Sequence, residues 1–168
     1  MAWKTHILVV ANVTADSDEL LSAMRQRSDR GPTSFTLIVP PRDHGDRSRE
    51  RGQARLDRAL ARARESGIEI DGALGDCDPV VAISEAFDPR SYDEIFVSTL
   101  PVGTSRWLQI DLPHRVGRLT GVPVSHIVGR EERPRARSVA RPAPERRGVL
   151  TPLTPLTWGG TRRRSRTG

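Results

Sequence analysis

Short apolar runs alternate with longer amphipathic stretches over the first 128 residues. Runs of this length predict β-strands, and a run with no polar interruption, such as Ile95 to Val97, predicts a strand covered on both faces. The runs that predict strands lie at 6–11, 35–39, 68–74, 93–99 and 123–128. The third run alternates apolar and acidic side chains, which is typical of an edge strand.

The stretches between these runs carry helix signals. Asp16 with Glu19 three residues later predicts a capping box that starts a helix reaching about Arg27, and Gly31 and Pro32 end it. The next helix, with an alanine and leucine stripe, is predicted for about 51–66 after a charged loop at 42–51.

Asp78 followed by Pro79 predicts the start of the third helix, because the carboxylate accepts from free N–H groups and a proline there wastes no donor. The resulting alternation of strands and helices predicts an α/β fold, an open doubly wound five-stranded parallel sheet of the Rossmann-like kind with helices on both faces. Ligands of such sheets lie beyond the carboxyl ends of the strands, so a site is expected in the loop at 98–106.

Charge divides the chain into two parts. Residues 1–128 carry 16 basic and 18 acidic side chains, a net charge of −2, whereas residues 129–168 carry 11 and 3, a net charge of +8. This last segment is rich in Arg, Pro, Gly, Ser and Thr and has no helical or strand period. We therefore expect a domain at 1–128 and a disordered basic tail at 129–168.

Two interpretations of the tail remain open. A solvated terminus is favoured, and the alternative is weak contact with nucleic acid, another polyanion or a protein partner. The alternative depends on a cluster of four arginines: Arg162, Arg163, Arg164 and Arg166. Deletion of the tail would abolish such binding, and unchanged binding would exclude it.

Other functional classes have little support in the sequence. No run is long enough to span a bilayer and no secretory signal is evident, so the expected location is the cytoplasm, with no membrane partner. No nucleophile elbow or phosphate-binding Walker loop is present, so we expect no catalytic residues and no enzyme activity. The four histidines have no ligand spacing, and we expect no metal site. They are His6, His44, His114 and His126.

The single cysteine, Cys77, lies between Asp76 and Asp78. If those carboxylates are close to the thiol they raise its pKa, which is the opposite of what a reactive thiolate needs. A redox role is therefore not expected.

The strand DEIFVST, the polar loop after it and the closing segment TGVPVSHIV resemble the universal stress protein family, of the adenine nucleotide alpha hydrolase-like superfold. The resemblance covers about residues 5–128. It implies strand order 3-2-1-4-5 and a homodimer made by pairing of the last strands at Pro123 to Val128. In one subgroup it also implies ATP bound where strands 1 and 4 diverge.

The resemblance also implies which positions lie near a ligand, and most of them have an ordinary structural alternative as strand, turn or cap residues. ATP-binding members usually carry an aspartate where this chain has Asn12. The candidate binding residues are Asn12, Thr14, Val39, Asp76, Ser98, Thr99, Gly103, Thr104, Ser105, Arg106, His114 and Arg115.

The chain departs from the motif of the ATP-binding subgroup, Gly-x2-Gly-x9-Gly followed by Ser or Thr. Leu100 and Pro101 stand near the first glycine, and Asp111, Leu112 and Pro113 replace the final Gly-Ser. We expect Asp111 to cap the free amides of the following helix and so to oppose a triphosphate at that helix end.

Arg106, His114 and Arg115 could offset this repulsion by direct pairing with phosphates. The sequence thus predicts a non-catalytic, homodimeric binding or regulatory domain of the universal stress protein type, with a degraded nucleotide loop and no expected cofactor. An ATP-binding or other adenine nucleotide-binding stress sensor remains the alternative.

Overall fold

The computed structural model describes residues 3–101 and 103–130. The tail predicted for 129–168 lies outside this part of the chain, apart from its first two residues, and the prediction of disorder concerns residues that are not described. Within the described residues no helix combines the length and the apolar character needed to cross a membrane.

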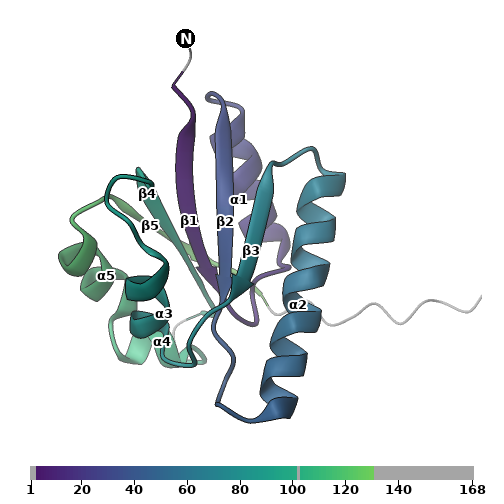
Figure 1. Ribbon diagram of the computed structural model, residues 1–168, viewed down its shortest axis with the longest axis vertical. Helices are drawn as coiled ribbons and strands as arrows, with labels where there is room; N and C mark the ends of the chain where they lie inside the picture. Colours follow the sequence, from purple (N-terminus) through teal and green to yellow (C-terminus); the bar gives the residue numbers. More distant parts are fainter. Residues whose placement is uncertain (1–2, 102, 131–168) are drawn as a thin grey trace, which may run out of the picture. The chain divides into compact units, whose positions relative to one another are not determined.

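Five parallel strands form one sheet in the order β3-β2-β1-β4-β5 (Figure 1). This order and the parallel pairing confirm the fold class predicted from the sequence, including the strand order implied by the resemblance. The strands are β1 (Thr5–Ala11), β2 (Thr33–Val39), β3 (Ile70–Leu74), β4 (Glu94–Thr99) and β5 (Val124–Val128).

Helices cover both faces of this sheet (Figure 1). One layer is made by α1 (Asp18–Ser28) and α2 (Asp46–Glu65), the other by α3 (Pro79–Ala86) and α5 (Leu112–Thr120). The short α4 (Arg106–Gln109) lies between β4 and α5 in the chain and was not predicted. Its single turn has too few residues to show a helical period.

The central strand β1 supplies both cores. Successive side chains of a strand point to opposite faces, so Ile7 and Val9 pack toward α1 and α2, whereas Leu8 and Val10 pack toward α3 and α5. All four are completely buried. This double burial explains why the strand is continuously apolar and does not alternate.

Two helix starts differ from the prediction. The α1 helix is capped by Ser17, whose Oγ accepts from Leu20 N, while Asp16 forms an ion pair with Arg58 instead. The α2 helix begins at residue 46, five residues earlier than expected, because its first turn is charged and exposed and so carries no apolar period.

Gly129, the residue after β5, packs against the loop that follows β1. The N–H of Gly129 donates to the carbonyl of Thr99 at 2.9 Å. A Cβ placed on Gly129 would lie 2.6 Å from Ser17 Oγ and 3.2 Å from the Cβ of Thr14. Only a residue without a side chain fits this close approach.

We expect Gly129→Ala to lower the free energy of unfolding by about 1–3 kcal/mol, since the added methyl group displaces the Ser17 cap of α1. Gly117→Ala is the matched control. Its Cβ would meet only Val124, at an ordinary 3.7 Å, and removal of a helical glycine should raise stability by about 0.5–1 kcal/mol. Urea unfolding measures both, and an unchanged midpoint for Gly129→Ala would contradict the close packing.

Candidate functional site

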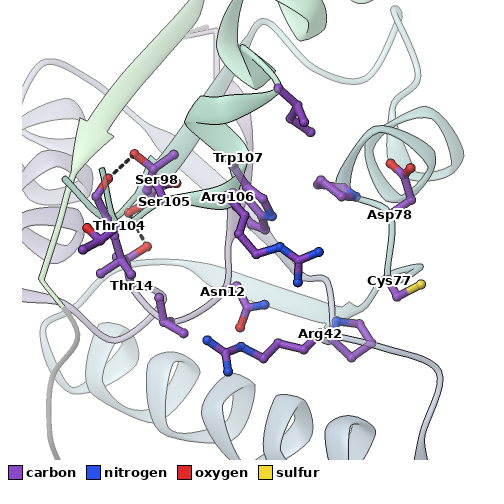
Figure 2. Close-up of a pocket in the computed structure, with 16 residues that line it drawn as sticks. Asn12, Thr14, Arg42, Cys77, Asp78, Ser98, Thr104, Ser105, Arg106 and Trp107 are labelled. Carbon is purple, nitrogen blue, oxygen red and sulfur yellow. Dashed lines mark hydrogen bonds between the residues drawn. The ribbon is translucent and has the colours of Figure 1, made fainter. Parts of the chain in front are cut away.

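A pocket of about 400 Å³ opens at the carboxyl ends of β1 and β4, where the strand order reverses (Figure 2). Its volume lies within the range of about 300–1,000 Å³ that is usual for small-molecule sites. Polar side chains line much of it, together with a smaller apolar set. The polar set is Asn12, Thr14, Arg42, Cys77, Asp78, Ser98, Thr99, Thr104, Ser105 and Arg106, and the apolar set is Val13, Pro41, Pro79, Leu100, Trp107 and Ile110.

Hydroxyl groups hold the inner wall of the pocket in place. Ser98 Oγ donates to Thr14 Oγ1 at 2.8 Å, and this buried contact joins the end of β4 to the loop after β1 (Figure 2). Thr99 Oγ1 contacts the Leu100 carbonyl at 3.0 Å and His126 Nε2 at 2.7 Å. The wall is therefore fixed before any ligand arrives.

Two arginines give the pocket its positive charge. Arg42 follows β2 and Arg106 begins α4, and both are exposed. Across residues 3–101 and 103–130, neither guanidinium makes a hydrogen bond or an ion pair with the protein. An anion entering the pocket would thus find two cationic forks without protein partners.

Asn12 is seen between these two guanidinium groups in Figure 2. Its Oδ1 accepts from Arg55 Nη1 at 2.7 Å, which fixes the amide. An aspartate at this position would add a negative charge beside the same arginines. The asparagine keeps the site cationic.

In the loop after β4, two backbone N–H groups are hydrogen-bonded to a carbonyl of the same loop. The carbonyl of Pro101 accepts from the N–H groups of Thr104 at 3.1 Å and Ser105 at 3.3 Å, and from Thr104 Oγ1 at 2.8 Å. Ser105 Oγ in turn caps the N–H of Leu108. Phosphate-binding loops present such N–H groups to the ligand, whereas these two N–H groups are engaged within the loop.

The expected role of Asp111 was wrong. Its backbone is left-handed, with φ 51°, and its side chain caps no amide of α5. The carboxylate pairs instead with His114 Nδ1 at 2.7 Å, because the left-handed turn directs it along the helix surface. The start of α5 does not line the pocket, so Asp111 and Pro113 do not stand between a ligand and its site.

The structure brings together seven of the twelve candidate residues and leaves the others elsewhere. Those that line the pocket are Asn12, Thr14, Ser98, Thr99, Thr104, Ser105 and Arg106, and those that do not are Val39, Asp76, Gly103, His114 and Arg115. Val39 is fully buried in the core beside α1 and α2.

Sequence reasoning missed Arg42, although it follows the end of β2 and so lies at the same edge of the sheet as the predicted site. That position was the available signal, because the carboxyl ends of parallel strands meet at one edge. Trp107, which follows Arg106 in the chain, is half-buried in the pocket wall.

Cys77 lies on the side of the pocket where α3 begins (Figure 2). Partial burial and the neighbouring Asp76 carboxylate raise the pKa of its thiol, as the flanking acids led us to expect. Its Sγ lies 3.0 Å from the Nε2 of His44. This thiol is neutral near pH 7, which does not favour nucleophilic chemistry.

These features define a doubly wound α/β protein with a binding pocket at its switch point. Solved structures of universal stress proteins are among those similar to it. A universal stress protein in complex with cAMP is 18% identical, with a TM-score of 0.53, and the match covers 77% of this chain and 100% of that one. The universal stress protein from Archaeoglobus fulgidus is 17% identical, with a TM-score of 0.54, covering 74% and 98%.

The chain therefore has the fold of the universal stress proteins. No protein-family model matches its sequence, and no curated protein matches it either. At these low identities the likeness concerns the fold, and the function must be argued from the site.

The pH dependence of folding should report the desolvation of His126. Desolvation lowers the pKa of His126 below 6.5, so the imidazole is neutral at pH 7 and resists protonation in the folded state. The stability that this group contributes is present above pH 6.5 and is lost as the pH falls through its lower, folded-state pKa.

Urea unfolding above and below that pH should therefore show that the wild type loses more stability on acidification than His126→Gln. The imidazole resonance that disappears in the variant should titrate below 6.5. Identical pH profiles for the two proteins would contradict this assignment.

Proposed function

We propose that this chain is a non-catalytic binding protein of the universal stress protein type, and that its pocket holds an adenine nucleotide with a single phosphate, such as AMP or cAMP. One observation carries the proposal. Two guanidinium groups that have no partner within the described part of the chain flank a pocket of about 400 Å³ at the switch point of the sheet. A structurally similar protein in complex with cAMP supports the same ligand class.

The phosphate would be held by side chains. Arg42 and Arg106 offer planar forks that match phosphate oxygens, and Asn12 adds amide donors between them. The charge on two arginines balances that of one phosphate group. A triphosphate carries more charge and needs the loop amides that Pro101 already engages, so this site favours a monophosphate over ATP.

The nucleoside has an apolar surface to contact. Trp107 and Ile110 follow Arg106 on the same short segment, and Val13 and Pro41 line the pocket as well. An adenine ring gains from contact with such surfaces and with an indole in particular. ATP is the alternative ligand within this proposal. It would occupy the same pocket as AMP or cAMP but would require more hydrogen-bond donors for its phosphates.

The proposal includes no reaction. Asp78, the acidic residue that lines the pocket, accepts from the N–H of Val80 and is committed to capping α3. The hydroxyls of Ser98 and Thr14 bond to each other, and no side-chain base among the described residues is hydrogen-bonded to either. Binding, with a regulatory role in a stress response, is the function this arrangement supports. A cytoplasmic location and a polyanion-binding tail remain predictions from the sequence.

Isothermal titration of the full-length chain tests the ligand class. We expect saturable, one-per-chain binding of AMP or cAMP, and a loss of about tenfold in affinity for each of Arg42→Ala and Arg106→Ala, since each removes a charge-assisted contact. Arg115→Ala is the matched control, an exposed arginine on α5 outside the pocket.

The double variant Asp111→Gly with Pro113→Ser should leave affinity unchanged, because the start of α5 does not line the pocket. No heat of binding for any adenine nucleotide, with the circular dichroism spectrum intact, would overturn the proposal. Tighter binding of ATP than of AMP would overturn the preference for one phosphate.

We also propose that two copies pair through β5. This strand is an edge of the sheet, and its last residue Val128 is 47% exposed, while Leu119 on the neighbouring α5 is 55% exposed. An open edge with apolar side chains next to it favours pairing with a second strand.

Light scattering during gel filtration should report a dimer, and Val128→Arg should convert it to a monomer by placing a charge on this edge. Val81→Arg is the control, since Val81 is 41% exposed but belongs to α3. A monomeric wild type, or a Val128→Arg protein that stays dimeric, would exclude pairing at β5.

A further inference from the structure

Three side chains of different metal-binding chemistry meet at the side of the pocket. His44 comes from the loop after β2, and Asp76 and Cys77 come from the loop after β3. One ligand atom from each lies within 4.8 Å of the other two. We propose that these residues form a binding site for a divalent metal ion of the zinc type.

The geometry is close to what zinc requires. A tetrahedral ion with a Zn–S bond of about 2.3 Å and a Zn–N bond of about 2.05 Å holds sulfur and nitrogen about 3.6 Å apart. In the metal-free arrangement Cys77 Sγ and His44 Nε2 are 3.0 Å apart. Binding therefore needs an opening of roughly half an ångström, which a side-chain adjustment of the exposed His44 supplies.

The donor set selects the kind of ion. Thiolate and imidazole ligands suit zinc and cobalt, whereas magnesium and calcium prefer an all-oxygen shell. The Cys77 thiol releases its proton to solvent as the metal binds. Three protein ligands also leave one tetrahedral position for water or another small donor. Because Cys77 lines the pocket, that fourth ligand has access from the same cavity.

Hydrogen bonds within each of the two loops hold that loop in shape. The N–H of Asp78 donates to Asp76 Oδ1 at 2.8 Å, which orients that carboxylate. On the other loop, Asp43 Oδ1 accepts from the N–H of Gly45, and Ser48 Oγ accepts from the N–H of Arg42. Supports of this kind orient metal ligands.

No spacing motif in the sequence predicted this metal site. His44 and Cys77 are 33 positions apart, and they meet only because β2 and β3 are neighbours in the sheet. The competing explanation is a plain hydrogen bond between the thiol and the imidazole that pins the two loops together. Metal titration separates these explanations.

Cobalt titration of the full-length, tag-free protein is the direct test, since Cys77 is its single cysteine and any thiolate-to-cobalt absorption band must come from it. We expect a band that saturates at one cobalt per chain and disappears when zinc is added. Cys77→Ser should abolish the band, and His44→Ala and Asp76→Asn should each weaken binding by at least about tenfold.

His114→Ala is the control, since His114 pairs with Asp111 and is exposed, as a non-specific histidine and carboxylate site would be. In parallel, zinc should protect Cys77 of the wild type from alkylation, and a chelator should reverse this protection; this readout needs no variant to fold. The test contains no nucleotide, so its result is independent of the proposed function.

Absence of the band, or a band of equal strength in the His44→Ala and Asp76→Asn proteins, would overturn the proposal. The first result would leave only a thiol–imidazole hydrogen bond, and the second would show that the thiol binds metal without its neighbours. Failure of zinc to slow alkylation of the wild type would lead to the same conclusion.

Discussion

The complete burial of β1 is the constraint on which the rest of the structure depends. With helices on both of its faces and a neighbour on either side, this strand fixes where β2 and β4 lie. The chain runs outward from β1 in one direction through β2 and β3, and in the other through β4 and β5. A crevice between the connections on opposite faces follows from this reversal, and the pocket occupies it.

Within this crevice, the local backbone decides which chemistry is available. The amides of Thr104 and Ser105 bond to the Pro101 carbonyl, and among the described residues the guanidinium groups of Arg42 and Arg106 have no bonding partner. The same fold can thus serve different ligands through a few residues at the strand ends. The likeness to structures that are 17% and 18% identical fits this division between scaffold and site.

The sequence predicted most of the fold because its signals are local. Continuous apolar runs identified the strands, and Asp78 with Pro79 identified the start of α3. The predicted start of α2 was wrong because a charged, exposed first turn has no apolar period to detect. The predicted capping role of Asp111 was wrong because the preference of aspartate for caps does not reveal a left-handed backbone.

The site was only partly predictable, for a different reason. Residues after β1 and β4 could be placed because a resemblance named those loops, but Arg42 and His44 belong to a connection whose course depends on how α2 packs. Contacts between distant loops exist only once the sheet is assembled. No pattern in either loop alone contains them.

Gly129 joins the end of the described chain to the wall of the pocket. It contacts Thr99 through its N–H and lies against Thr14, and both residues belong to the pocket wall. Gly129 is therefore held directly behind the binding site. A side chain added at this one position would disturb the end of β5, the cap of α1 and the pocket wall together.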